Sequence, residues 1–240
     1  MVLLLALASP ADAVTWEVLE ARLAEVAPLR ETRLATAAPP ITVDEYKAAA
    51  NGEIPTNLVS VADVAAKKAY GLAVFDVSVG KLWAAINDDV GKVERTRLSF
   101  GEVLAGKPCS TPRTVFQYLP TPIVVSDRWW VSDFAENKAA WDATGGRVRE
   151  LQWASNGNPK PTTGKAAEWA ESGIAVAWTK GAWLLIDIDG SNTLVEYYTW
   201  SDPGGNLPAG PVSSFSSSGV ADTVQVMADL AKAGPSCPIR

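Results

Sequence analysis

Histidine is absent from the 240 residues of this chain. Without an imidazole, the chain cannot form the Ser-His-Asp or Cys-His systems of nucleophilic catalysis, and it lacks the side chain that most often binds zinc and other transition metals. We therefore predict no catalytic residues, no metal site and no cofactor. The composition favours a binding protein over an enzyme.

Basic runs are also missing. The chain has 21 lysines and arginines against 27 aspartates and glutamates, so its formal net charge is -6 at pH 7. Nucleic acids are bound through clusters of Lys and Arg that neutralise phosphates. Because no such cluster occurs, we predict no nucleic-acid partner.

Long apolar runs are scarce. The run over residues 2–8 has seven residues, whereas a membrane-spanning helix needs about 20. It precedes Ala11, Asp12 and Ala13, which supply the small-x-small pattern of a secretory cleavage site. We predict a signal peptide over residues 1–13 and a periplasmic or secreted protein, although the basic residues that usually open such a segment are missing. The alternative is a cytosolic chain with a frayed hydrophobic end.

Cysteine occurs only twice, as Cys109 and Cys237. In an oxidising compartment the two thiols are expected to pair. A bridge between them would close a long loop and would contribute about 4 to 5 kcal/mol in the chain-entropy model. Two unrelated free thiols are the alternative.

The N-terminal part has the pattern of helices. Thr15 can cap a helix in which Leu19 and Leu23 recur at helical spacing, and a second, short helix is predicted over residues 44–50. We predict a helical extension over residues 14–66 that packs on the rest of the protein.

From residue 68 onward, β-rich segments alternate with short turns, apart from a short helix predicted over residues 79–87. The predicted strands cover residues 70–77, 92–100, 114–119, 123–134, 148–153, 174–178, 183–188 and 193–200. Because most of the connections are short, these strands are expected to be antiparallel neighbours.

The last segment, residues 213–233, is predicted to be a long helix. Val220, Val224 and Met227 fall on one face of it. A long helix after an antiparallel sheet buries its apolar stripe on a face of that sheet. We therefore predict an α+β domain over residues 67–234, with a curved sheet of about seven to nine strands against this helix and a short tail over residues 235–240.

Three segments resemble the START domains, the lipid-transfer branch of the helix-grip, pollen-allergen-like superfamily. They are FDVSVGKLWAAINDD (75–89), RTVFQYLPTPIVVSDRWWV (113–131) and TLVEYYTWSDPGGNLPAG (193–210), in the family's order. The resemblance is to lipid-binding proteins of the bacterial exported type, and residues 14–66 match the family only loosely. It implies the helix-grip fold, with the sheet wrapped around the C-terminal helix, and an internal cavity for a lipid, sterol, carotenoid or fatty acid.

The candidate ligand-binding residues are the aromatic sets of the strands, an arginine and the apolar stripe of the last helix. They are Arg97, Phe116, Tyr118, Trp129, Trp153, Trp178, Tyr198, Trp200, Phe215, Val224 and Met227. Strand alternation separates two faces but does not say which is the inner one. The aromatic sets could instead pack beneath the N-terminal helix, and Arg97 could be an ordinary solvated charge rather than a partner for an anionic headgroup.

Two other functions remain as alternatives. The resemblance also extends to aromatase/cyclases and hydrolases, for which Glu150, Glu196 and Tyr198 are the candidate acid or base groups. A protein-interaction module using Trp129 and Trp130 is the third class. We expect a monomer that binds a hydrophobic small molecule, and a transient membrane contact is the other partner class considered.

Overall fold

A computed structural model describes residues 14–121, 125–204 and 209–239, without the side chains of residues 209–218. The predicted signal peptide and the side chain of Phe215 therefore lie outside the described residues.

Nine strands form one sheet in the order β1-β2-β9-β8-β6-β5-β4-β3, antiparallel throughout, while the short β7 pairs parallel with β5. The strands are β1 Thr56–Val61, β2 Val64–Phe75, β3 Phe100–Gly106, β4 Arg113–Leu119, β5 Arg128–Glu136, β6 Val148–Ser155, β7 Ile174–Ala175, β8 Trp178–Asp187 and β9 Thr193–Asp202. The helices are α1 Trp16–Val26, the 3-10 turn η1 Ala27–Thr32, α2 Val43–Ala50, α3 Val79–Asn87, α4 Gly91–Arg95, α5 Lys138–Thr144, α6 Gly164–Ser172 and α7 Ala209–Ala233.

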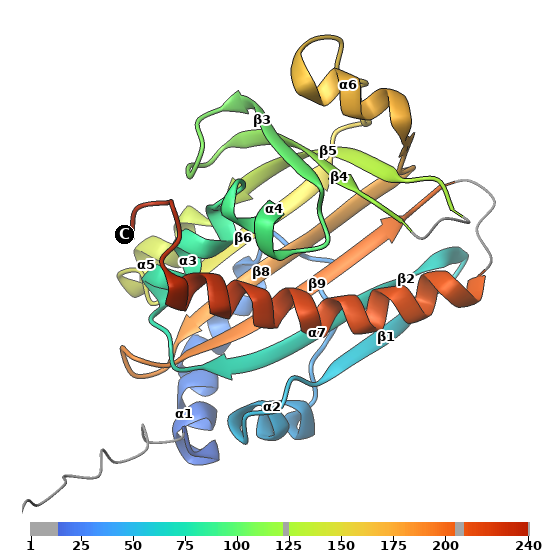
Figure 1. Cartoon of the computed structure of the whole chain (residues 1–240). Helices are drawn as coiled ribbons and strands as arrows, with labels where there is room; N and C mark the ends of the chain where they lie inside the picture. Colours follow the sequence, from blue (N-terminus) through green and yellow to red (C-terminus); the bar gives the residue numbers. More distant parts are fainter. Residues whose placement is uncertain (1–13, 122–124, 205–208, 240) are drawn as a thin grey trace, which may run out of the picture.

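The sheet has two covered faces. The inner face carries α7, which lies lengthwise across the strands with α3 and α4 beside its C-terminal half (Figure 1). The outer face carries α1, η1 and α2, and α6 covers it farther along, over β4 and β5. This is the predicted α+β helix-grip arrangement, with a C-terminal helix on an antiparallel sheet and N-terminal helices packed against it.

The order of the strands differs from a simple meander. β2 pairs with β9, and α3 and α4 then carry the chain to β3 at the opposite edge of the sheet. β1, which pairs with β2, lies within the segment predicted to be helical. The sheet therefore begins before residue 67.

The strand predicted over residues 92–100 is wrong. Asp88 accepts a hydrogen bond from the Gly91 N–H at 2.9 Å, and α4 follows before β3 begins at Phe100. Side-chain bonds of this kind start a helical turn in place of a strand.

The strand predicted over residues 174–178 is also divided. Val176 donates its N–H to the Trp129 carbonyl on β5, but the Ala177 N–H goes to Asp202 on β9. The chain changes neighbours between these two residues, so β7 ends and β8 begins.

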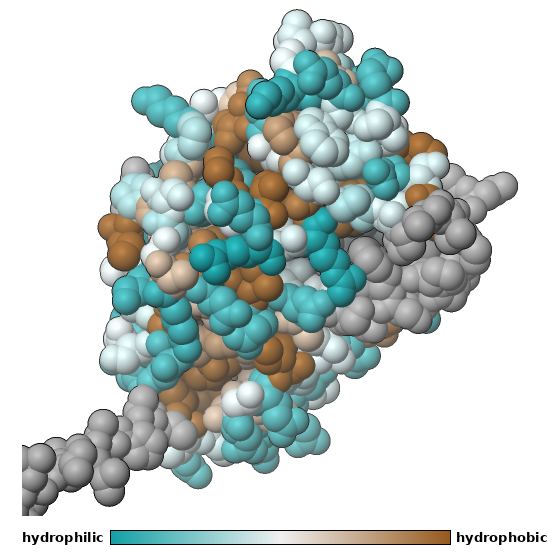
Figure 2. Space-filling view, viewed as in Figure 1, coloured by the Kyte–Doolittle hydropathy of each residue, from teal (hydrophilic) through white to brown (hydrophobic). Residues whose placement is uncertain are grey.

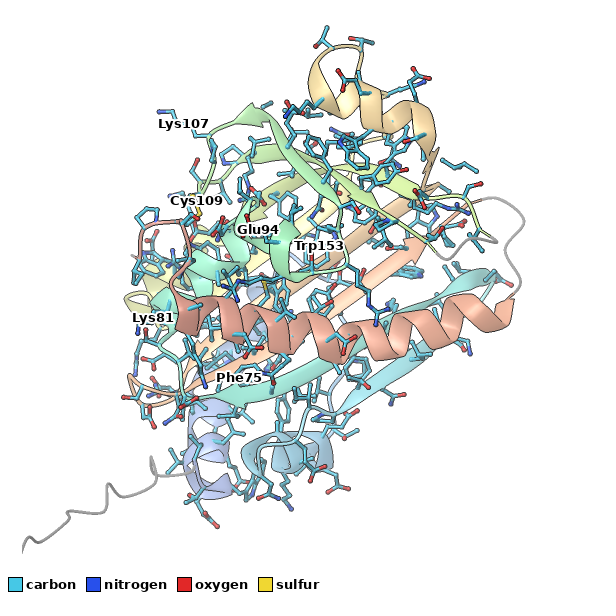
Figure 3. All side chains as sticks on the ribbon, viewed as in Figure 1. Phe75, Lys81, Glu94, Lys107, Cys109 and Trp153 are labelled. Carbon is cyan, nitrogen blue, oxygen red and sulfur yellow. A yellow bond between two sulfur atoms is a disulfide. The ribbon has the colours of Figure 1, made fainter. Side chains whose placement is uncertain are left out.

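The predicted disulfide is confirmed. Cys109 in the β3–β4 loop is bonded to Cys237 in the tail after α7, with a Cα–Cα distance of 5.4 Å (Figure 3). Asp88 also accepts the Ser236 N–H at 2.7 Å, and Lys232 near the end of α7 pairs with Asp76. The C-terminal end of α7 and the tail after it are therefore held by these three contacts, with Cys109, Asp88 and Asp76.

Candidate functional site

The last helix lies directly against the sheet. Val220, Val224 and Met227 of α7 are 2%, 0% and 1% exposed. A Cβ added at Gly71 of β2 would lie 2.7 Å from a methyl carbon of Val220, so the absence of a side chain there allows the close approach. The outward surface around α7 mixes hydrophilic and apolar residues (Figure 2), as expected for a helix that buries one stripe.

Aromatic rings from four strands form a row on the inner face, defined here as the aromatic row: Phe134, Trp153, Tyr197 and Trp183. The Trp153 ring lies 6.2 Å from Phe134 and 5.7 Å from Tyr197, and Trp183 lies 4.3 Å from Tyr197, measured between ring centroids. Figure 3 labels Trp153 in the middle of this face. Burial raises the pKa of Tyr197 to about 12, against a smaller lowering by a hydrogen bond with Thr199, so its phenol stays neutral.

Gly181 explains how Trp153 reaches across β8 to Tyr197 on β9. It is paired with Trp153 in the register of β6 and β8, and a Cβ there would lie 2.1 Å from the indole. No side chain longer than hydrogen fits beneath the ring. The aromatic row therefore depends on a glycine in the central strand.

A second row lies beside the aromatic row on the inner face, two residues along β5 and β6 and four residues along β8 and β9. Ser132 on β5 lies opposite Ser155 on β6, and Thr179 on β8 lies opposite Ser201 on β9. The Thr179 N–H donates to the Ser155 hydroxyl at 3.0 Å, and the Thr179 and Ser201 hydroxyls are 2.6 Å apart. We call these four residues the hydroxyl row.

Ser132 differs from the other members of the hydroxyl row. It is 0% exposed, and its hydroxyl has no hydrogen-bond partner in the part of the chain that the structure describes. Side chains two apart on a strand point to the same face, so Ser132 shares the inner face with Phe134. This unpaired hydroxyl therefore lies on the inner face of the sheet.

The arginines of the inner face are engaged. Arg113 binds Asp89 with two hydrogen bonds of 2.7 and 3.1 Å, and Arg128 donates to the carbonyls of Pro203 and Gly204 at 2.7 and 3.1 Å.

Arg149 lies between two indoles, 3.9 Å from the Trp83 centroid and 4.0 Å from that of Trp141, and bonds to Glu136 at 3.2 Å. Together with Arg113 and Arg128, it contributes to packing and to loop anchoring on this face.

Solved structures share this architecture, whereas no family model and no curated protein matches the chain. The STAR-related lipid transfer protein of Xanthomonas axonopodis (fragment 25-204) superposes with a TM-score of 0.62 at 16% identity, over 75% of this chain and 93% of that one. Human StAR-related lipid transfer protein 5 gives 0.60 at 11% identity, over 90% and 97%. A START superfamily protein of Mycobacterium smegmatis gives 0.50 at 6%, over 69% and 97%.

The chain has the START fold. No helix among its described residues combines the length and the apolar character that a membrane crossing requires.

Four of the predicted ligand-binding residues border the inner face of this START fold. Trp153 belongs to the aromatic row, and Val224 and Met227 are on the buried stripe of α7. Arg97 precedes β3 and is 46% exposed; it pairs at 2.6 Å with Asp222 on α7. It therefore holds α7 from the solvent side.

Three predicted residues lie on the outer face beneath α6. Phe116, Tyr118 and Trp129 pack in one cluster with α6, where the Tyr118 ring is 4.7 Å from that of Trp169. The Trp129 indole N–H donates to the Gly173 carbonyl at 3.2 Å. The structure does not bring these rings to α7.

Three more predicted residues also lie on the outer face. Trp178 and Trp200 meet edge to face, with centroids 5.0 Å apart, and Lys68 and Lys180 lie over the Trp200 ring at 4.8 and 4.4 Å. Tyr198 packs with Ala35 and Tyr70 beneath the N-terminal segment.

Two of the residues considered for catalysis take part in buried ion pairs. Glu150 and Glu196 are buried on the outer face, where Arg33 pairs with Glu150 at 3.0 Å and Arg30 pairs with Glu196. The Tyr46 hydroxyl donates to Glu196 at 2.8 Å. Burial alone would raise the pKa of Glu196, but the charges of Arg30 and Arg33 and the hydrogen bonds from Arg30 and Tyr46 together outweigh it, and the pKa lies below its usual value.

Two small cavities adjoin this ion-pair cluster, one lined by Glu150 and the other by Glu196 and Tyr198. Each has a volume of about 10 Å³, roughly the room for one water molecule. Neither can hold a lipid.

Sequence reasoning missed most of the inner wall. Phe134, Trp183 and Tyr197 were not singled out, nor was the hydroxyl row. Strand alternation placed Tyr197 and Thr199 on one face and Tyr198 and Trp200 on the other, but no signal in the sequence showed which face α7 covers. Gly181 was the available hint, because a glycine in a strand often marks a close approach.

Proposed function

We propose that this START-fold protein binds a hydrophobic small molecule between the inner face of the sheet and the N-terminal half of α7. The observation that carries the proposal is the aromatic row, which lies on the face crossed by a 25-residue helix. Rings of this kind supply large apolar area to a ligand. Two of the solved structures with this fold are named lipid transfer proteins.

The position of the proposed ligand along α7 follows from how the two halves of the inner face are packed. Toward its C-terminal half, Val224 and Met227 pack into the main core cluster with α3 and the sheet. The hydroxyl row lies toward the other end, where β9 leads through Pro203 to α7. The ligand is therefore assigned to the end of the sheet where α7 begins.

Binding without catalysis is part of the proposal. The carboxylates Glu150 and Glu196 are on the outer face and are neutralised by Arg30 and Arg33. Glu196 is a poor proton acceptor, because its charged form is stabilised and its pKa is lowered. The disulfide supports the further proposal that the protein works in an oxidising compartment outside the cytoplasm.

The test compares tryptophans on the two faces. The protein is delipidated and titrated with a bromine-labelled alcohol of 16 carbons, which quenches nearby indoles. We expect saturable quenching that is reduced in Trp153→Phe, where Trp183 remains as the other indole of the aromatic row, and unchanged in the outer-face control Trp200→Phe. Of the two replaced tryptophans, only Trp153 lies on the inner face. Native mass spectrometry of the protein as purified gives a second readout. Absence of both a copurified lipid and saturable binding would refute the proposal.

A further inference from the structure

We infer that the ligand carries one uncharged polar group, a hydroxyl or a carbonyl, and that Ser132 receives it within the hydroxyl row. This inference rests on the proposed function and specifies the chemical class of the ligand. It makes the ligand a neutral amphipath, such as a long-chain alcohol or a sterol-like molecule, in place of a fatty acid anion or a phospholipid headgroup.

The first argument is the unpaired hydroxyl. Buried polar groups in native proteins are nearly always hydrogen-bonded, and one left unpaired costs about 1 to 3 kcal/mol. Ser132 is fully buried without a partner, whereas Thr179 and Ser201 are already bonded to each other. A ligand group that pairs with the Ser132 hydroxyl removes this cost. The free protein carries the cost and the complex does not.

The second argument is the position of Ser132 beside the aromatic row. Phe134 lies two residues farther along β5, and successive residues on one face of a strand are about 7 Å apart. A ligand whose polar end reaches Ser132 would therefore place its hydrocarbon part against Phe134 and Trp153. The inner face thus has a polar end next to an apolar surface, which matches an amphipathic molecule.

The third argument is charge. An ionised carboxylate or phosphate taken out of water needs a cation or several donors. Arg113 is paired with Asp89, and Arg149 is stacked and bonded to Glu136. Arg128, at the end nearest the hydroxyl row, donates to the backbone of the segment before α7. Serine offers one donor and two acceptor positions, which suits an alcohol or a carbonyl.

Ser132 is sealed in this structure, since its exposure is 0%. A ligand reaches it only by displacing the elements that cover the inner face. Ligand uptake is therefore expected to be slower than the diffusion limit, so the affinity is measured only after protein and ligand have equilibrated.

The experiment uses the full chain after delipidation and three probes of equal length: dodecan-1-ol, dodecanoate at pH 8 and dodecane. Dodecan-1-ol is expected to bind most tightly. Ser132→Ala should weaken it about tenfold, the worth of one buried hydrogen bond, and leave dodecane unchanged. Ser60→Ala, on the exposed side of β1, is the matched control and should change neither.

Thermal unfolding of the free protein supplies an independent readout. Ser132→Ala removes a hydroxyl that has no partner, so its Tm should equal or exceed that of the wild type. A lowered Tm would show that the hydroxyl is already paired and would overturn the inference. Unchanged dodecan-1-ol affinity in Ser132→Ala, or dodecanoate binding as tightly as the alcohol, would also overturn it while leaving the proposed function intact. If none of the three probes binds, both the inference and the proposed function are refuted.

Discussion

At the scale of single residues, the inner face depends on where side chains are small. Gly71 lets Val220 of α7 approach β2, and Gly181 lets the Trp153 indole cross β8. Both glycines have ordinary negative backbone φ values or extended geometry, so their role is steric. The Trp153 indole of the aromatic row is therefore positioned by the absence of a single carbon atom at Gly181.

The substitution Gly181→Ala tests this dependence. Its Cβ would lie 2.1 Å from Trp153 and 2.4 Å from the Tyr198 carbonyl oxygen, so the ring and the strand must move apart. We expect a loss of about 1 to 3 kcal/mol in the free energy of unfolding, as for other overpacked cores, and a reduced near-ultraviolet circular dichroism signal. Urea denaturation measures the first. The control Gly219→Ala, on α7 with nothing within 4 Å, should be neutral or stabilising; equal losses in the two variants would contradict the steric explanation.

At the scale of elements, the N-terminal segment is held on the outer face by buried ion pairs. Arg30 and Arg33 follow α1 and bind the carboxylates of Glu150 on β6 and Glu196 on β9. Removing one partner of such a pair leaves the other charge uncompensated. The segment therefore depends on groups from two central strands.

Glu196→Gln is expected to destabilise the protein by roughly 3 kcal/mol, the lower end for a broken buried pair, because the Arg30 side chain is 30% exposed. The matched control is Glu171→Gln, which breaks the exposed pair with Lys160 and should cost less than about 1 kcal/mol. Urea denaturation at pH 7 compares the two.

The same pair predicts a dependence on pH. Since the folded pKa of Glu196 lies below its ordinary value, its contribution is complete above the unfolded pKa of about 4.3 and is lost as the pH falls through the folded pKa. Between about pH 5 and pH 3 the wild type should therefore lose stability more steeply than Glu196→Gln. Parallel curves for the two proteins would contradict this assignment.

At the scale of the whole molecule, a covalent bond joins the chain after α7 to the loop between β3 and β4. The C-terminal end of α7 is followed by Cys237, which is bonded to Cys109 across a sequence separation of 128 residues. Arg97 and Asp222 add one exposed ion pair near the middle of the helix, worth at most about 1 kcal/mol. The covalent bond is therefore worth more than this ion pair, and it adds to the burial of Val220, Val224 and Met227.

Replacing both cysteines by serine is expected to lower the free energy of unfolding by about 2 to 5 kcal/mol, because a long closed loop no longer constrains the unfolded chain. Thermal unfolding with and without reductant measures this loss. Reductant should lower the Tm of the wild type and leave that of the double variant unchanged. Two reactive thiols in the denatured, unreduced wild type would contradict the bond.

Much of the fold could be predicted from the sequence. The helical spacing of Leu19 and Leu23, the apolar stripe of Val220, Val224 and Met227, and the two isolated cysteines all correspond to features of the structure. These depend on local periodicity or on the chemistry of a residue type. The strand predicted over residues 92–100 is wrong because the Asp88 carboxylate starts a helical turn. The alternation of apolar and polar residues does not reveal such a turn.

What the sequence determined by itself was the alternation of side chains within most of the strands and the long amphipathic helix at the end. Only the tertiary structure decided which face of the sheet that helix covers, and so which aromatic residues line the candidate site. Trp178, Tyr198 and Trp200 are as aromatic as Trp153 and Trp183, yet they lie on the other face. Alternation defines two equivalent faces, and the register with neighbouring strands and the packing of α6 and α7 are non-local contacts that select between them.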